Sequence, residues 1–354
     1  MNPRMLALYP VVRPLLFALD PEQAHDVSLA GLQWAHRWTP FALPASAPIT
    51  AGSPVRVAGL SFPNRVGLAA GLDKNAAHLD ALGRFGFGFM EAGTVTPRPQ
   101  PGNPKPRMFR LPEGEAIINR FGFNNLGLEA FISNLKASTW VRERRGLLGL
   151  NIGKNANTPI EQAADDYLTC LEALYPWADY ITVNISSPNT KNLRGLQSAQ
   201  SLTPLLEALK RRQHELTSRL QRRVPLFLKV APDLDDEQIL DIAKAVNTHE
   251  FEGLIATNTT LDRSAVEGLA HAEEAGGLSG APLTGPSTSV LRRFREALLP
   301  EVALVGVGGI LSPFDGLVKR DAGADLVQVY SGLVYRGPRL VADLANDLAV
   351  AHPG

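Results

Sequence analysis

Eight short apolar runs, separated by longer segments, constrain the fold of this chain more than any other feature. They lie at 65–70, 88–93, 147–152, 180–186, 226–231, 253–258, 303–307 and 326–330, and are nearly continuous in valine, isoleucine, leucine and alanine. Strands that are buried on both faces have this composition. Amphipathic helices are predicted between them, for example at 161–174, 202–220 and 236–246. The pattern predicts an α/β fold, a (β/α)8 TIM barrel. A doubly wound sheet is the alternative, because a sequence does not show closure.

Two domains are expected, a helical domain at 1–47 and a barrel at 48–354. Helices are predicted at 5–19 and 21–38, with Asp20 as N-cap and Pro21 at the first helical position. Apolar residues occupy more of both helices than one packed face needs. The pair is therefore either a cap docked on the barrel or a hairpin that lies on a membrane surface. No apolar run reaches the roughly 18 to 20 residues of a membrane-spanning helix.

Charge and composition narrow the function. The 35 lysines and arginines balance the 35 acidic residues, which argues against a nucleic-acid partner. The single cysteine excludes an internal disulfide. The seven histidines show no paired ligand spacing, so no metal site is predicted. A proline-rich stretch at 96–125 is too long for an ordinary connection and predicts an excursion over the active face.

Polar residues gather where the predicted strands end, and a barrel builds its active site from those ends. Asn151, Asn184, Asn189 and Asn258 each offer one acceptor and two donors, which suits the mixed edges of a planar heterocycle. Together they predict a ligand cradle. Glycines at 306–309 and the segment 330–332 end the last two strands, where barrels frequently bind phosphate.

Two lysines, Lys74 and Lys229, follow strands in small or apolar surroundings. One interpretation is a Schiff-base lysine, which would make the protein an aldolase. The other is a fixed cation beside a flavin. The sequence pattern alone does not distinguish these two roles for the lysines.

The assembled motifs resemble those of the dihydroorotate dehydrogenases, specifically the quinone-dependent, membrane-associated class 2. The resemblance covers nearly the whole chain and is carried by segments 67–74, 93–102, 119–125, 184–189, 256–260 and 276–280. It implies that dihydroorotate passes a hydride to FMN and becomes orotate, in de novo pyrimidine (UMP) biosynthesis, and that a membrane quinone reoxidises the flavin. A non-catalytic membrane-binding barrel stays a further alternative.

The resemblance also assigns roles to residues. Ser187 matches the base that removes the C5 proton, a serine in class 2 and a cysteine in class 1. The substrate residues implied are Lys74, Asn119, Arg120, Phe121, Gly122, Phe123, Asn184, Asn189, Asn258 and Thr259. The FMN residues implied are Ala70, Gly71, Leu72, Asp73, Lys74, Thr94, Asn151, Asn184, Lys229, Thr257, Gly280, Gly309, Tyr330 and Ser331.

The resemblance also extends to the quinone site of the family, which involves the helical domain. His25, Arg110 and Tyr330 correspond to quinone-site positions. The resemblance implies a peripheral membrane protein on the cytoplasmic side of the cell membrane, attached through the N-terminal helices. A monomer is expected.

Overall fold

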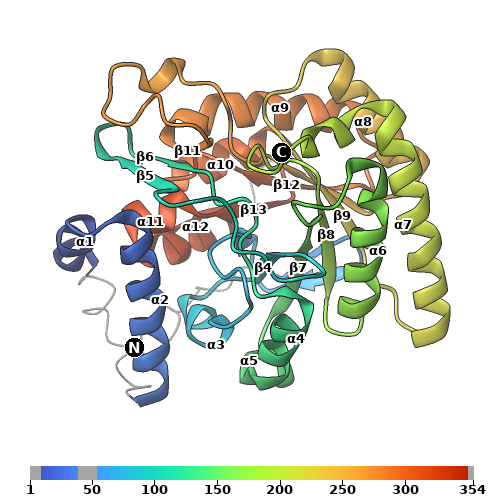
Figure 1. Cartoon of the computed structure of the whole chain (residues 1–354), viewed down its shortest axis with the longest axis horizontal. Coiled ribbons are helices and arrows are strands. Elements are labelled where there is room, and N and C mark those ends of the chain that lie inside the picture. Colours follow the sequence, from blue (N-terminus) through green and yellow to red (C-terminus); the bar gives the residue numbers. More distant parts are fainter. Residues whose placement is uncertain (1–8, 39–53, 350–354) are drawn as a thin grey trace.

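The computed structural model describes residues 9–38 and 54–349, and its centre is a closed barrel of eight parallel strands (Figure 1). The strands are β3 (Val66–Leu68), β4 (Phe89–Val95), β7 (Leu147–Ile152), β8 (Tyr180–Asn184), β9 (Leu226–Val230), β10 (Gly253–Ala256), β12 (Ala303–Val307) and β13 (Leu326–Val329). Each lies within or overlaps one predicted run. Pairing of β13 with β3 closes the barrel. The TIM barrel is thus confirmed and the doubly wound sheet is excluded.

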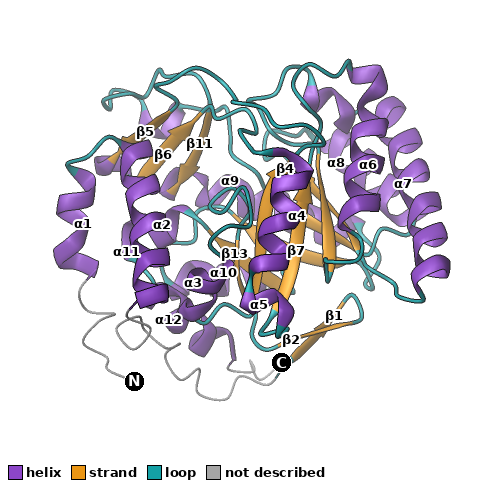
Figure 2. Ribbon diagram, turned by 60° about the horizontal axis from the view of Figure 1, so that its bottom comes forward, coloured by secondary structure: helices purple, strands orange, loops and turns teal. Residues whose placement is uncertain are grey.

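Helices surround the barrel and cover the outer faces of its strands (Figure 2). They are α3 (Leu79–Leu82), α4 (Gly127–Ala137), α5 (Thr139–Arg142), α6 (Ala163–Leu174), α7 (Ala199–Leu220), α8 (Asp236–Thr248), α9 (Thr284–Ala297), α10 (Pro313–Asp321), α11 (Ser331–Arg336) and α12 (Arg339–Ala349). The three predicted amphipathic helices are confirmed as α6, α7 and α8. A capping box formed by Asp235 and Gln238 fixes the start of α8.

Aromatic rings fill the end of the barrel at which its strands begin. Neighbouring ring centroids lie 5.1, 6.2 and 4.9 Å apart in the series Phe62, Phe89, Tyr180 and Phe227. Phe62 comes from a hairpin of β1 (Val55–Val57) and β2 (Leu60–Phe62) at this end of the barrel (Figure 2). Because the rings occupy this end, a ligand site is left to the opposite, carboxyl end of the strands.

Strand glycines leave the space that these rings need. An added Cβ atom would lie 2.3 Å from the Phe89 ring at Gly67 and 2.1 Å from the Tyr180 ring at Gly149. At Gly253 it would lie 2.8 Å from the ring of Phe227. Each of these contacts is shorter than packed carbon atoms tolerate, so each ring depends on the glycine that faces it.

A second sheet lies beyond the carboxyl ends of the barrel strands (Figure 2). It pairs β5 (Met108–Leu111), β6 (Ala116–Asn119) and β11 (Gly277–Gly280) in antiparallel fashion. The proline-rich excursion supplies β5 and β6, so this segment contains regular strands that the sequence pattern does not predict. The pairing with β11 fixes the excursion over the active face.

The N-terminal helices, α1 (Tyr9–Phe17) and α2 (Pro21–Trp38), pack beside α11 and β5 (Figure 1). Asp20 Oδ1 accepts hydrogen bonds from the N–H groups of Glu22 and Gln23, both at 3.0 Å, which confirms Asp20 as the N-cap. Residues 5–8 of the predicted first helix lie outside the described residues. Within the described ranges, no helix has the length and apolarity to cross a membrane.

Candidate active site

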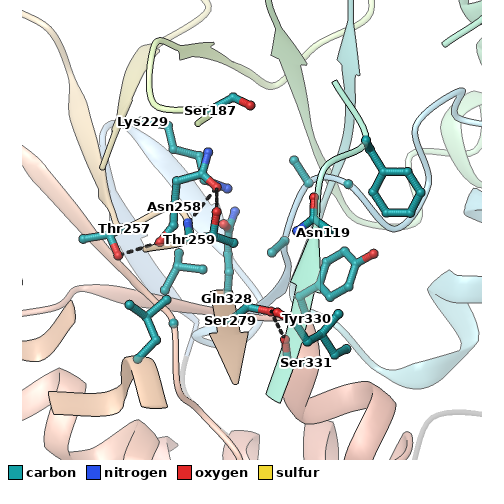
Figure 3. Close-up of a pocket in the computed structure, with 18 of the residues that line it drawn as sticks. Asn119, Ser187, Lys229, Thr257, Asn258, Thr259, Ser279, Gln328, Tyr330 and Ser331 are labelled. Atoms are coloured by element: carbon teal, nitrogen blue, oxygen red, sulfur yellow. Dashed lines mark hydrogen bonds between the residues drawn. The ribbon is translucent and has the colours of Figure 1, made fainter. Parts of the chain in front are cut away.

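A polar cavity opens at the carboxyl end of the barrel and encloses about 1090 Å3 of space, including its mouth. Its walls come from the ends of β3, β4, β8, β9, β10, β12 and β13 and from β5, β6 and β11. Figure 3 labels ten of the side chains that line it. The predicted substrate and flavin residues that line it are Ala70, Gly71, Lys74, Thr94, Asn119, Phe121, Gly122, Phe123, Asn184, Ser187, Asn189, Lys229, Thr257, Asn258, Thr259, Gly280, Gly309, Tyr330 and Ser331.

Hydrogen bonds fix the orientation of the strand-end amides. Asn184 Nδ2 donates to Thr94 Oγ1 at 3.0 Å, and Thr94 in turn donates to Asn151 Oδ1 at 2.6 Å. Asn258 Nδ2 donates to Ser186 Oγ at 2.9 Å, while its Oδ1 accepts from the N–H of Thr259 at 2.8 Å. These bonds hold the amides in single rotamers, so the cradle is pre-organised for one ligand shape.

Ser187 lies in the turn after β8 with only 5% of its surface exposed. Its Oγ accepts a hydrogen bond from the N–H of Asn189 at 3.2 Å, and within the described chain its O–H donates to no group. Asn189 Nδ2 donates to the carbonyl oxygen of Asn119 at 3.0 Å and so joins this turn to β6. Ser187 therefore presents an uncommitted hydroxyl to the cavity.

Lys229 and Gln328 face the cavity with unpaired polar atoms (Figure 3). Among the described residues, Lys229 Nζ makes no hydrogen bond or ion pair, and Gln328 Oε1 accepts no hydrogen bond. Burial lowers the pKa of Lys229, and the carboxylate of Glu91 opposes that shift. Buried polar groups are rarely left unpaired. A donor and an acceptor without partners in the lining of one cavity fit the alternating N–H and C=O edge of a flavin.

Glycines after β12 form the far end of the cavity. Gly308 and Gly309 have φ of 106° and 72°, values that other residues rarely adopt. A Cβ on Gly309 would also lie 2.3 Å from the backbone of Thr284. Ser279 and Ser331 share a hydrogen bond of 2.8 Å nearby (Figure 3). Glycine backbone and hydroxyl groups of this kind fit a phosphate.

Lys74 lines the cavity from the loop after β3, a strand that β13 separates from β12 in the closed barrel. Its Nζ lies 4.2 Å from the centroid of the Phe121 ring. Burial lowers the pKa of Lys74 to about 8, against the attraction of Glu22. Lys74 is half-buried and can still pair with an anionic ligand in the cavity.

Four of the predicted residues do not line the polar cavity. Asn151 is fully buried behind Thr94, and Asp73 accepts the N–H groups of Ala77 and His78. Arg120 points outward and pairs with Glu274 at 2.7 Å. Leu72 lines a second cavity instead. A segment that matches the family motifs thus indicates the path of the backbone. The packing around that segment determines which of its side chains line the cavity.

The second cavity is apolar and lies between the N-terminal helices and the barrel. It encloses about 1520 Å3, again with its mouth included, and all three predicted quinone-site residues, His25, Arg110 and Tyr330, line it. Burial lowers the pKa of His25 to about 3, so the imidazole is neutral near pH 7. Burial also raises the pKa of Tyr330 to about 12. Met108 and Tyr330 line both cavities and form the wall between them.

Several residues of the polar cavity escaped the sequence analysis. Gln328 lies in an apolar run that reads as an ordinary strand, and Ser279 belongs to a quoted motif without being assigned a role. Met108 and Ile117 come from β5 and β6, which were not predicted. The described ranges contain no group of three histidine, cysteine or acidic side chains arranged to hold a metal ion.

Comparisons with known proteins agree on one family. The model of the dihydroorotate dehydrogenase family matches residues 54–351. "Dihydroorotate dehydrogenase (quinone)" of Ralstonia nicotianae is 59% identical over 346 residues, which cover 97% of this chain and 99% of that protein. The protein of the same name from Cupriavidus pinatubonensis is 59% identical over 342 residues, 97% of this chain and 98% of its own.

Solved structures lead to the same family. The crystal structure of DHODH from Eimeria tenella in complex with ferulenol superposes with a TM-score of 0.86 at 38% identity. It covers 93% of this chain and 90% of that chain. The ligand-free form from the same organism has a TM-score of 0.84 at 39% identity, with coverages of 93% and 94%.

Proposed function

The chain belongs to the dihydroorotate dehydrogenase family, and from this premise we propose that its polar cavity holds FMN with the pyrimidine substrate, and its apolar cavity the quinone. The protein oxidises dihydroorotate to orotate with a quinone as electron acceptor, the redox step of pyrimidine synthesis. The observation that carries the assignment of cavities is their common wall of Met108 and Tyr330. Membership of this family excludes the Schiff-base aldolase and the non-catalytic barrel.

The flavin is assigned to the side of the polar cavity formed by β9, β12 and β13. Lys229 and the unpaired oxygen of Gln328 would contact the pyrimidine edge of its ring, while the N–H groups of Gly308 and Gly309 would hold its phosphate. When bound, FMN supplies the hydride acceptor for the reaction. Lys229 holds positive charge beside the ring, which favours its anionic form.

The substrate is assigned to the side formed by Lys74, β6 and the turn after β8. Lys74 would pair with its carboxylate, and the amides of Asn119, Asn189 and Asn258 would bind the N–H and C=O groups of its ring. Ser187 then removes the proton from C5. As it takes this proton, its own O–H proton must pass to a relay, since an isolated serine is a poor base.

The quinone is assigned to the apolar cavity. Its tail fits the space between α1 and α2, and Arg110 stands at the carbonyl end, where its guanidinium packs on the Phe17 ring at 4.6 Å. His25 is neutral and can donate or accept a hydrogen bond there. Tyr330 separates this site from the flavin side.

Membrane attachment is proposed to occur through the outer faces of α1 and α2, on the cytoplasmic side of the cell membrane. Large apolar side chains are exposed on both helices: Val11 (68%), Leu15 (71%), Val27 (56%), Trp34 (61%) and Trp38 (64%). Exposed apolar groups around the mouth of an apolar cavity favour an interfacial orientation. A quinone can then enter from the bilayer. The monomer expected from the sequence stays a prediction, which light scattering can check.

Replacing Leu15 with glutamate should weaken binding to lipid vesicles about tenfold, because a charge replaces an apolar side chain at the interface. The measurement is vesicle sedimentation. Phe314→Glu is the matched control, since Phe314 is also 71% exposed but lies on α10, away from the helical pair. Equal vesicle binding by the Leu15→Glu variant and the wild type would refute the proposed orientation.

The assigned reaction is tested by spectroscopy of the purified protein. We expect the absorbance of oxidised flavin, its bleaching by dihydroorotate without oxygen, and its return on addition of a quinone. A protein that cannot be loaded with FMN, or whose flavin does not respond to dihydroorotate, would contradict the proposed function.

A further inference from the structure

Glu22, in the first turn of α2, is buried although it belongs to the helical pair, with 8% of its surface exposed. Its carboxylate accepts hydrogen bonds from Arg107 Nη2 at 2.8 Å and Arg107 Nε at 3.2 Å, and Lys105 Nζ lies at 3.2 Å. Burial opposes ionisation of Glu22, but the bonds from Arg107 and Lys105 outweigh it and hold its pKa below the ordinary value. A buried ion pair therefore joins α2 to the proline-rich excursion at 96–125.

Arg107 extends this contact into the wall of the polar cavity. Its Nη1 donates to the carbonyl oxygens of Pro101 at 2.6 Å and Asn103 at 3.0 Å. Its guanidinium carbon lies 5.3 Å from the centroid of the Phe121 ring, within cation–π range. All the nitrogen atoms of this guanidinium are thus engaged, and its position fixes that of the loop and the ring.

Phe121 has a second cation within range, Lys74. Both Phe121 and Lys74 line the polar cavity, and Asn103 Nδ2 donates to the carbonyl oxygens of Arg120 at 2.8 Å and Asn189 at 3.3 Å. The loop held by Arg107 therefore also contacts the turn that carries Ser187. Contacts run without interruption from Glu22 to the substrate residues.

The charges around Lys74 give Glu22 a second effect. The groups that face it are Glu22, His25 and Asp26 of α2, Arg107 before β5, and the adjacent Asp73. Glu22 supplies the strongest attraction among them and Arg107 the main repulsion. Without the carboxylate of Glu22, only the weaker attractions of Asp26 and Asp73 would oppose the repulsion by Arg107, and Lys74 would lose its proton at a lower pH.

We propose that Glu22 is a positioning residue for the substrate cavity, which holds Phe121 in place through Arg107 and keeps the Lys74 ammonium charged for the substrate carboxylate. The inference rests on the proposed function. It links the two cavities, because α2 carries both Glu22 and, three residues on, His25 of the apolar cavity. The packing of α2 against the barrel then affects both the affinity for the substrate and the access of the quinone.

The test uses the full-length, FMN-loaded enzyme and the variant Glu22→Gln, which keeps the size of the side chain and removes its charge. Orotate is titrated between pH 6 and 9, and its Kd is read from the flavin absorbance. We expect the Kd at pH 8 to rise about fivefold or more, and the weakening of orotate binding with rising pH to begin at lower pH. The KM for dihydroorotate should rise more than kcat falls.

Asp26→Asn is the control, because it removes the same charge from an exposed position of the same helix. It should leave the orotate Kd within about twofold, since exposed charges are screened. Glu22→Asp, which restores the charge, should recover part of the orotate affinity. If the Glu22→Gln variant does not fold, the orotate Kd is measured on Glu22→Asp instead. An orotate Kd and pH profile unchanged in Glu22→Gln would overturn the proposal, whatever happens to the quinone KM. Failure of wild type to bind orotate would instead refute the proposed function.

Discussion

Replacement of Ser187 by alanine is expected to slow flavin reduction by dihydroorotate about 10²–10⁴-fold, the usual cost of removing a general base. Orotate and FMN should still bind, because the one hydrogen bond that Ser187 Oγ accepts among the described residues is from the N–H of Asn189, and its loss leaves the amide cradle intact. Stopped-flow absorbance of the enzyme-bound flavin measures the rate without the quinone step.

Ser187→Cys is the companion variant. The site is buried and shaped around a hydroxyl, so the larger thiol should restore the rate only in part. A Ser187→Ala rate within about tenfold of wild type would remove Ser187 from the role of base. Unchanged orotate affinity in the same variant separates a chemical role from a structural one.

Lys229→Met should yield a protein that loses most of its FMN yet is more stable in its apo form. The ammonium of Lys229 is buried without a partner among the described residues, so the folded apoprotein bears the cost of its desolvation. Methionine fills similar space without that cost. The loss of FMN is measured as the flavin content of the purified protein. The gain in stability is measured by thermal unfolding of the apoprotein.

The stability effect has a defined pH dependence. Because burial lowers the pKa of Lys229 in the folded state, the unfolded chain binds the proton more tightly. Apoprotein stability should therefore rise with pH between the folded pKa and the ordinary value, about 10.4, and this rise should shrink in Lys229→Met. Full flavin content with an unchanged reduction rate would show that the flavin-side assignment of Lys229 is mistaken.

Lys154→Met is a matched control for a buried lysine. Lys154 is 1% exposed, but its Nζ donates to the carbonyl oxygens of Asn155 at 2.8 Å and Thr158 at 2.7 Å. Its replacement removes both hydrogen bonds, although the carbonyl oxygen of Asn155 still accepts the N–H of Thr158 at 3.2 Å. The loss of these bonds should destabilise the protein. Opposite signs for the two lysines would show that the effect of Lys229 comes from its missing partner.

The sequence predicted the barrel well because its strands are buried on both faces, which leaves an unbroken apolar run in each. It missed β5, β6 and β11. The pairing of β11 with β6 joins segments about 160 residues apart, and no local pattern records such a pairing. The same limit applies to the site. The motif at 119–123 was identified, but the outward direction of Arg120 depends on Glu274, far along the chain. The Glu22–Arg107 pair, 85 residues apart, was not visible either.

The aromatic floor of the barrel has a consequence for how this family can evolve. Gly67, Gly149 and Gly253 each face a ring that an added Cβ would overlap. A larger residue can enter at any of them only if the facing Phe89, Tyr180 or Phe227 becomes smaller at the same time. Each glycine and its ring therefore form one heritable unit, and substitutions at the two positions should appear together across lineages, in correlated pairs rather than singly.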